Sequence, residues 1–163
     1  MRMAVLVLAM LALFAGGASA AEKGDVIPRF ATLRSDLVNL RTGPGQRYPV
    51  AWVYRRKGLP IEIIAQYEEW RQVRDSQVTT GWVNQQLVTA IRNVVVKDAQ
   101  RILRADADPA SAPVAKLDPG VIAHLLECRG AWCRIETQNT NPVVRGWLGR
   151  AEIWGVYPDE VIR

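Results

Sequence analysis

The chain repeats itself, and this constrains its fold more than any other feature of the sequence. The stretch "VNLRTGPGQRYPVAWVYRRKGLPIEIIAQYEEWRQV" at 38–73 shares its frame with "RILRADADPASAPVAKLDPGVIAHLLECRGAWCRI" at 101–135. The matched positions are Leu40-Arg41 with Leu103-Arg104, Pro49-Val50-Ala51 with Pro113-Val114-Ala115, Gly58 with Gly120, Trp70 with Trp132, Val73 with Ile135, and Gly81-Trp82-Val83 with Gly146-Trp147-Leu148. The offset stays between 62 and 65 residues, so the two copies should share one fold.

Each copy has the composition of a small β unit. Its segments are short, alternating or apolar, and they are interrupted by Gly, Pro, Asn and Asp, which is typical of short strands joined by turns. In the first copy the expected strands are 50–54, 59–65, 71–74 and 81–83. A sheet this small must close or cover its edges, so we predict an all-β fold with one small barrel per copy. The joining segment "TAIRNVVVKDA" is not rich in Pro, Gly or Ser, which favours barrels that pack together.

The first twenty residues, "MRMAVLVLAMLALFAGGASA", predict a secretory signal peptide. Arg2 precedes an apolar run at 4–14, and Ala18-Ser19-Ala20 is the small-residue pattern that signal peptidase cleaves. The apolar run is much shorter than the roughly 20 residues that cross a bilayer as a helix. We therefore expect cleavage after Ala20, a periplasmic or secreted protein, and no stable membrane insertion of the mature chain.

The chain has two cysteines, Cys128 and Cys133. In an exported protein such a pair usually forms a disulfide. The residues between them, "RGAW", favour a hairpin loop that would bring the two Cα atoms within disulfide distance. A ring this small should stabilise the fold by about 2 kcal/mol. We therefore predict a structural disulfide rather than a redox centre.

The stretch "RTGPGQR" at 41–47 has the glycine content of either a phosphate-binding loop or a turn. A phosphate-binding loop would open a helix and continue with Lys and Ser or Thr, and neither follows here. Pro44 also removes a backbone donor. The second copy fills the same place with Asp106, Asp108 and Pro109, which are turn formers. We therefore predict a turn and leave open whether its rim also binds a ligand.

The first copy resembles the bacterial SH3-like domain family. Members run through an asparagine, a hydrophobe and an arginine, then a Gly-Pro-Gly turn, Tyr-Pro-Val, Lys-Gly, a tryptophan and Gly-Trp-Val. This sequence has them at Asn39, Leu40, Arg41, 43–45, 48–50, Lys57-Gly58, Trp70 and 81–83. The second copy is a degenerate member, since "RADADP" replaces the glycine turn. The stretch "WCRIETQNTNPVVRGWLGRAEIWGVYP" also resembles an exported subfamily with tandem copies.

The resemblance implies two tandem SH3-like barrels, at 30–92 (the first copy) and 93–158 (the second copy), behind the signal peptide at 1–20. Barrels of this family often accompany cell-wall hydrolases and are implicated in holding peptidoglycan or its stem peptides. The resemblance therefore implies a non-catalytic exported binding module of the cell envelope, whose partner is a cell-wall glycan or peptide. The alternatives are an adaptor that binds an envelope protein, and a purely structural module.

The repeat also offers an internal control that separates scaffold from binding site. A position kept in both copies most simply serves the fold. This assigns Arg41 and Arg104 to bracing a turn, and the kept tryptophans to packing. The kept tryptophan pairs are Trp70/Trp132 and Trp82/Trp147. Trp154 and Tyr157 in the tail have no counterpart, and we expect them to pin the chain end by packing.

The strand "AWVY" at 51–54 differs between the copies. Alternation puts Trp52 and Tyr54 on one face and Ala51 and Val53 on the other. We match Trp52 and Tyr54 to charged residues, Lys116 and Asp118, in the second copy. We therefore expect both rings to point outward. The alternative is that Trp52 and Tyr54 pack against the second copy.

The predicted ligand-binding side chains are the aromatic and basic residues specific to the first copy. They are Arg47, Tyr48, Trp52, Tyr54, Arg55, Arg56 and Tyr67. Aromatic rings stack on sugars or peptides, and arginines bind carboxylates or phosphates.

Catalysis requires convergent polar groups that this sequence scarcely has. Its single histidine, His124, lies four residues from Cys128, roughly 13 Å away along a strand, and a zinc site there would lack a fourth ligand. We expect no enzymatic activity, no cofactor and no metal. The net charge of +5 invites nucleic acid binding, but the excess is small and the chain is exported, so we expect no nucleic acid partner.

Overall fold

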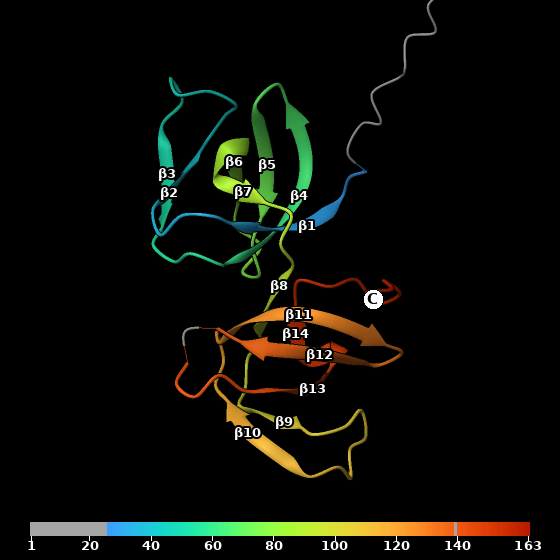
Figure 1. Cartoon of the computed structure of the whole chain (residues 1–163). Helices are drawn as coiled ribbons and strands as arrows, with labels where there is room; N and C mark the ends of the chain where they lie inside the picture. The colour runs from blue at the N-terminus through green and yellow to red at the C-terminus, as the bar shows by residue number, and fades with distance from the viewer. Residues whose placement is uncertain (1–25, 139) are drawn as a thin grey trace, which may run out of the picture.

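The computed structural model describes residues 26–138 and 140–163, and the predicted signal peptide at 1–20 lies outside these ranges. The described residues form fourteen strands and two short 3-10 helices, arranged as two antiparallel sheets of seven strands each. Figure 1 shows the sheet of the first copy above that of the second copy, with β8 leading from one to the other. None of the helices in these ranges is long and apolar enough to cross a membrane.

The two sheets have the same strand order. The first sheet contains β1 (Arg29–Leu33), β2 (Val38–Arg41), β3 (Val50–Tyr54), β4 (Pro60–Tyr67), β5 (Trp70–Arg74), β6 (Thr80–Asn84), η1 (Gln85–Leu87) and β7 (Val88–Thr89). The second contains β8 (Asn93–Val96), β9 (Arg101–Arg104), β10 (Pro113–Leu117), β11 (Ile122–Arg129), β12 (Trp132–Thr137), β13 (Arg145–Gly149), η2 (Arg150–Glu152) and β14 (Ile153–Trp154). The orders β3-β2-β6-β5-β4-β1-β7 and β10-β9-β13-β12-β11-β8-β14 correspond strand for strand. The repeat in sequence is therefore a repeat in structure.

Neither sheet closes into the predicted barrel. Within residues 26–138 and 140–163, no strand pairing joins β3 to β7 or β10 to β14, which are the edge strands of the two sheets. The edge strands β7 and β14 are only two residues long, so they leave too few free backbone groups to drive closure. The fold is all-β with two tandem units, as predicted, but its sheets are open.

Each sheet bends around a core of its own. The largest fully buried side chains include Leu33, Leu40, Ile61 and Ile63 in the first copy, and Leu103, Ile135, Leu148 and Ile153 in the second. The glycines of the Gly-Trp motif have a packing role. A Cβ at Gly81 would lie 2.5 Å from the side chain of Leu40, and a Cβ at Gly146 would lie 2.5 Å from the carbonyl oxygen of Arg104. Only glycine lets these strands approach so closely.

The pairing of β3 corrects the sequence match by one residue. Leu40 on β2 lies opposite Trp52, and Leu103 on β9 lies opposite Ala115. Trp52 therefore corresponds to Ala115 and not to Lys116. The identical Pro-Val-Ala triplets, which set the match in sequence, are displaced by one position along the strand. A slip of one residue exchanges the two faces of a strand.

The prediction that Tyr54 points outward was therefore wrong. Tyr54 corresponds to the buried Leu117, and its ring is only 5% exposed in the core of the first copy. Its hydroxyl donates to the Asp75 carboxylate at 3.0 Å, and burial together with Asp75 raises the pKa of Tyr54. Trp52 lies on the same face of β3 and is 57% exposed. The expectation that Ala51 faces inward was also wrong, because Ala51 is exposed.

The two copies pack directly against each other, as the joining segment predicts. The ring of Phe30 lies edge-on to that of Trp154, with centroids 4.9 Å apart, and its centroid is 4.6 Å from that of Tyr157. The Tyr157 hydroxyl donates to the buried Glu62 carboxylate at 2.8 Å. Burial and then this hydrogen bond raise the pKa of Tyr157. The tail aromatics pack as expected, but against the first copy.

Cys128 and Cys133 form the predicted disulfide. They lie opposite each other on β11 and β12, beside the turn at Gly130. The bond staples a hairpin of the second copy. The corresponding hairpin of the first copy has Gln66 opposite Arg71 and no such link.

Candidate functional site

The glycine-rich stretch of the first copy is a turn, as predicted, and it seats an aromatic ring. The ring of Tyr48 packs so closely over the turn that a Cβ at Gly43 would lie 2.4 Å from it, and one at Gly45 would lie 3.3 Å from it. The guanidinium of Arg47 lies 5.2 Å from the centroid of the same ring. The glycines therefore present Tyr48 and Arg47 together.

Arginines brace this turn and its counterpart. Arg41 donates to the carbonyl oxygen of Gln46 at 3.0 Å and to that of Tyr48 at 2.8 Å. In the second copy, Arg104 donates to the carbonyl oxygen of Ser111 at 2.8 Å. The bracing role predicted for this pair of arginines is confirmed.

The aromatic and basic residues predicted to bind a ligand do not form one surface. Tyr67 is exposed at the tip of the hairpin between β4 and β5. The hydrogen bond from Arg47 to Tyr48 raises the pKa of Arg47. Trp52 is exposed on the edge strand β3. That Arg47, Tyr48, Trp52 and Tyr67 bind a ligand stays a prediction.

The other predicted residues lie elsewhere. Tyr54 is buried in the core. Arg56 donates to the carbonyl oxygen of Gly120 at 2.7 Å, so it joins the two copies. Arg55, which precedes Arg56 in the sequence, is exposed.

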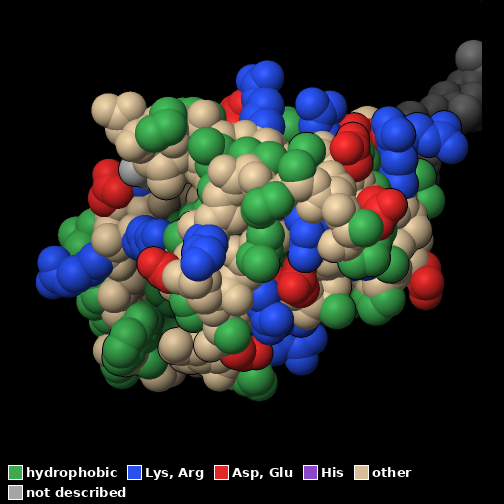
Figure 2. All heavy atoms as spheres, turned by 90° about the horizontal axis from the view of Figure 1, so that it is seen from below, with side chains coloured by type: hydrophobic (Ala, Val, Ile, Leu, Met, Phe, Trp, Pro, Cys, Tyr) green, Lys and Arg blue, Asp and Glu red, His purple; other side chains and the backbone are tan. Residues whose placement is uncertain are grey.

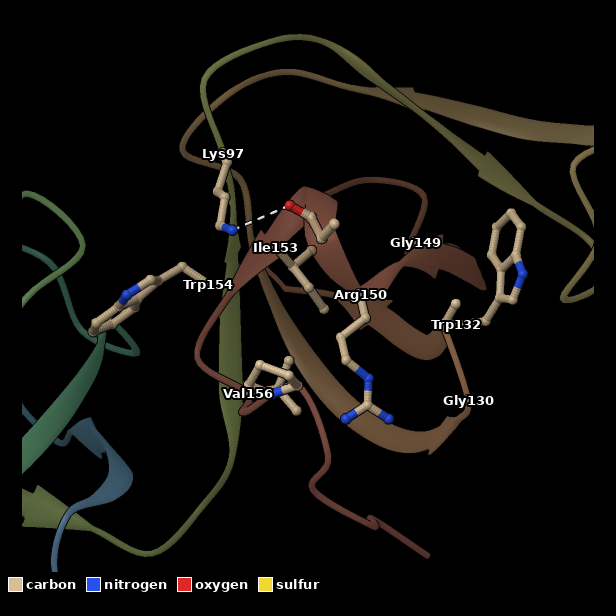
Figure 3. A pocket seen from close by; sticks show the side chains of 11 residues that line it. Lys97, Gly130, Trp132, Gly149, Arg150, Ile153, Trp154 and Val156 are labelled. Carbon is tan, nitrogen blue, oxygen red and sulfur yellow. Dashed lines mark hydrogen bonds between the residues drawn. The ribbon is translucent and has the colours of Figure 1, made fainter.

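The second copy has a cleft between the tip of the hairpin that joins β11 to β12 and the tail that follows β14. We call it the tryptophan cleft. Its volume is about 630 Å³, and its lining residues are Lys97, Gly130, Ala131, Trp132, Gly149, Arg150, Ala151, Ile153, Trp154, Val156 and Pro158. Figure 3 shows Trp132 and Trp154 on opposite sides, with Ile153 and Arg150 between them. The walls are therefore largely apolar and aromatic.

The charged groups of the tryptophan cleft are both cationic. Lys97 donates to the carbonyl oxygen of Ala151 at 3.1 Å (Figure 3), which leaves the other ammonium hydrogens for a ligand. Arg150 donates to the carbonyl oxygens of Tyr157 and Glu160 at 2.7 and 2.9 Å, so it holds the tail in place. Asp and Glu are absent from the lining residues. The cleft suits a ligand with an apolar or ring-shaped body and a negative group.

The tryptophan cleft shares two lining residues with a cavity at the junction between the copies. Lys97 and Trp154 also line a second cavity of about 540 Å³, whose other walls include Ser76 and Gln77 of the first copy and Gly120 of the second.

Sequence reasoning missed the tryptophan cleft because it assigned both the tryptophans kept in the two copies and the aromatic residues of the tail to packing. Trp132 was assigned to packing, yet it is half-buried and lines the cleft. Trp70, its counterpart, is also half-buried and lines a smaller cavity of about 160 Å³. The useful signal was in the second copy, where Trp154 and Arg150 are copy-specific.

The groups considered for catalysis do not converge. His124 is half-buried at the junction, with its Nδ1 3.4 Å from Oδ1 of Asn93. Both cysteines are consumed by the disulfide. Within the described ranges, no three His, Cys, Asp or Glu side chains gather as metal ligands.

Comparison with known protein families identifies the family of the chain. A model described as "Bacterial SH3 domain" matches twice, at residues 34–89 and 97–155. The chain belongs to the bacterial SH3 domain family. The two matches fall on the two sheets, so each copy is a bacterial SH3 domain.

Solved structures similar to this bacterial SH3 protein include NlpC1 and NlpC2 from Trichomonas vaginalis. NlpC1 is 11% identical to this chain, and the match covers 88% of this chain and 50% of NlpC1. NlpC2 is 10% identical, and the match covers 78% of this chain and 48% of NlpC2. The TM-score is 0.36 in both cases. The chain thus spans about half the length of these structures. No curated protein sequence matches it.

Proposed function

We propose that this bacterial SH3 protein is a non-catalytic binding module of the cell envelope and that it holds a cell-wall glycan or peptide. The observation that carries the proposal is the tryptophan cleft, whose lining combines apolar residues with Trp132, Trp154 and Lys97. Aromatic rings stack on the apolar faces of sugars, and an ammonium forms charge-assisted hydrogen bonds with carboxylates. Cell-wall polymers offer both groups along one extended chain.

The arrangement of charge on one face of the molecule does not favour nucleic acid as the partner. Figure 2 views the molecule from below, and Lys and Arg side chains are scattered there among hydrophobic and neutral ones. A protein that follows a phosphate backbone gathers its cations along a stripe. On the face in Figure 2 the cations do not form such a stripe.

Co-sedimentation with purified insoluble peptidoglycan tests the proposal. The mature chain (21–163) should pellet with the polymer, and Trp132→Ala should leave most of it in solution. Trp52→Ala is the matched control, because Trp52 is an exposed tryptophan on the first copy. If Trp52→Ala abolishes pelleting instead, the site lies on the first copy. If the unaltered chain does not pellet, the cell-wall proposal is wrong.

The second candidate is an adaptor that binds an envelope protein, and the exposure of Trp52 on an edge strand favours it. Edge strands offer backbone hydrogen bonds to a partner. Binding driven by charges on an anionic polymer should weaken steeply with salt, whereas docking of Trp52 on a protein should change little. Binding to envelope proteins that resists salt and needs Trp52 would favour the adaptor.

Both candidates require export, which follows from the predicted signal peptide. Amino-terminal sequencing of the protein recovered outside the cytoplasm should begin at Ala21. Recovery of the uncleaved chain from the cytoplasm would contradict both candidates.

A further inference from the structure

A polar pocket of about 530 Å³ lies where the first copy meets the second, and it shares no lining residue with the tryptophan cleft. We call it the Arg34 pocket. Its lining residues are Thr32, Leu33, Arg34, Lys57, Gly58, Thr89 and Ile91 of the first copy, and Asn93 and Gln138 of the second. The volume lies in the range of small-molecule sites, roughly 300 to 1,000 Å³.

Hydrogen bonds between the two copies hold the neutral polar groups of this pocket in place. The side-chain amide of Asn93, a residue only 2% exposed, donates to the carbonyl oxygen of Gly58 at 2.8 Å. The amide of Gln138 donates to Oδ1 of Asn93 at 3.0 Å, which leaves its second amide hydrogen for a ligand. The Thr89 hydroxyl accepts from the backbone N–H of Ile91 at 3.4 Å and keeps its own hydrogen to donate.

The charged lining groups of the Arg34 pocket are two exposed cations, Arg34 directly after β1 and Lys57 directly before Gly58. Neither side chain forms a hydrogen bond or an ion pair with any part of the described chain. Asp36 accepts from the backbone N–H of Lys57 at 3.2 Å, but Asp36 does not line the pocket. Asp and Glu are absent from the described residues that line it. The pocket therefore offers two positive charges to a ligand.

The second copy has a cavity at the corresponding place. The backbone N–H of Gly58 donates to the carbonyl oxygen of Leu33, and that of Gly120 donates to the carbonyl oxygen of Val96, each at 2.9 Å. Gly58 and Leu33 line the Arg34 pocket, and Gly120 and Val96 line the cavity of about 540 Å³ at the junction. The two cavities are therefore counterparts in the repeat.

The two counterparts differ in charge. At the places of Arg34 and Lys57, the second copy has Lys97 and Pro119. Its cavity is also lined by the acidic Asp98. The scaffold of the cavity is thus kept in both copies, whereas the pair of cations is specific to the first copy. A difference of this kind is what a ligand site on a duplicated scaffold would produce.

We propose that the Arg34 pocket binds a small phosphorylated ligand, namely a phosphate monoester on a hydroxylated body such as a sugar. Such a phosphate carries a charge of roughly −1.5 to −2 at pH 7, which matches two cations better than a single carboxylate does. The guanidinium of Arg34 can donate two parallel hydrogen bonds to the phosphate, and the Lys57 ammonium adds a point charge. Thr89 and Gln138 can donate to the hydroxyl oxygens of the body. The site does not depend on the cell-wall ligand.

Titration of glucose 6-phosphate into the ¹⁵N-labelled mature chain, at constant ionic strength, tests the proposal. The backbone amides of Gly58 and Thr89, followed by NMR, should shift saturably. Glucuronate, which carries one negative charge on the same sugar, should bind at least about fivefold more weakly. Inorganic phosphate should also bind more weakly, because it has no sugar hydroxyls for Thr89 and Gln138. Glucose should cause no saturable shift.

Matched variants locate the site. Arg34→Gln and Lys57→Gln should each weaken the binding of glucose 6-phosphate about tenfold, because each removes a charged hydrogen-bond donor. Arg55→Gln is the matched control, because Arg55 is exposed and does not line the pocket. Trp132→Ala should also bind as the unaltered chain does, because Trp132 belongs to the tryptophan cleft. The dispersion of each amide spectrum reports whether the variant is folded.

Four results would overturn the proposal. The first is the absence of saturable shifts at Gly58 and Thr89. The second is binding of glucuronate or inorganic phosphate as tight as that of glucose 6-phosphate, which would mean that the pocket takes any small anion. The third is equal weakening by Arg55→Gln and Arg34→Gln, which would mean a general attraction by net charge. The fourth is loss of binding in Trp132→Ala, which would place the ligand in the tryptophan cleft.

Discussion

In the second copy the edge of β11 is stapled by a disulfide at Cys128 and covered by the tail at Ile162, whereas in the first copy the corresponding edge at Gln66 is exposed. The cores and the strand orders of the two copies are nevertheless alike. A duplicated sheet therefore keeps the contacts that let strands approach each other and diverges at its edges and turns. Those divergent places are where the two copies can acquire different ligands.

The largest effect should come from the glycines that both copies share. Gly81→Ala or Gly146→Ala would place a Cβ 2.5 Å from the side chain of Leu40 or from the carbonyl oxygen of Arg104. Each change should lower the free energy of unfolding by about 3 kcal/mol, as measured by urea denaturation. A large loss from one change and none from the other would break the equivalence of the two copies.

Removal of the disulfide should affect only the second copy. The double change Cys128→Ser and Cys133→Ser should cost about 2 kcal/mol on the chain-entropy account, measured as a lowered midpoint of urea unfolding. Gln66→Ser, at the corresponding position of the first copy, is the control and should stay within about 0.5 kcal/mol. Equal costs at the two positions would mean that the staple contributes nothing specific.

The one-residue shift of β3 can be tested at two neighbouring aromatic residues. Tyr54→Phe removes the hydrogen bond to Asp75 in the core and should cost about 1.5 kcal/mol. Trp52→Ala removes a ring that is 57% exposed and should cost less. Thermal unfolding of both variants measures the difference. No cost for Tyr54→Phe would restore the outward orientation of Tyr54 that the sequence predicted.

The smallest effect concerns Glu160 and acid. Burial of Glu160 is outweighed by its hydrogen bonds with Arg92 and Tyr157, so its pKa is lowered in the folded chain. Its carboxylate contributes stability above the unfolded pKa of about 4.3 and loses it as pH falls through the lower folded value. Glu160→Gln should therefore cost at most about 1 kcal/mol at pH 7 and nothing well below pH 4. The free energy of unfolding of the unaltered chain and of Glu160→Gln, measured as a function of pH, tests this prediction. A difference between the two that grows as the pH falls would contradict it.

The features predictable from sequence are those that depend on local chemistry or on the repeat itself. The turn at 42–49 follows from its glycines and proline, the bracing role of Arg41 from its pairing with Arg104, and the disulfide from the short hairpin between its cysteines. Each of these is confirmed. The packed arrangement of the copies follows from a joining segment without linker composition.

The features that sequence misses depend on register and on contacts distant in the chain. The identical Pro-Val-Ala triplets set the sequence alignment of the two copies. The strand pairing, which places Trp52 opposite Leu40, shows that this alignment is one residue out of register. Trp132 looks like scaffold because both copies have it, yet it becomes a cleft wall only where the tail folds back beside it. The same fold-back hides Cys128 behind Ile162, and no spacing in the sequence indicates it.

Amide hydrogen exchange at two corresponding residues tests the central difference between the copies most directly. The N–H of Cys128 is bonded to the tail, so it should exchange at least about tenfold more slowly than that of Gln66. Removal of residues 161–163 should then bring Cys128 to the rate of Gln66. Equal rates in the intact chain, or protection of Cys128 that survives the removal, would contradict the account.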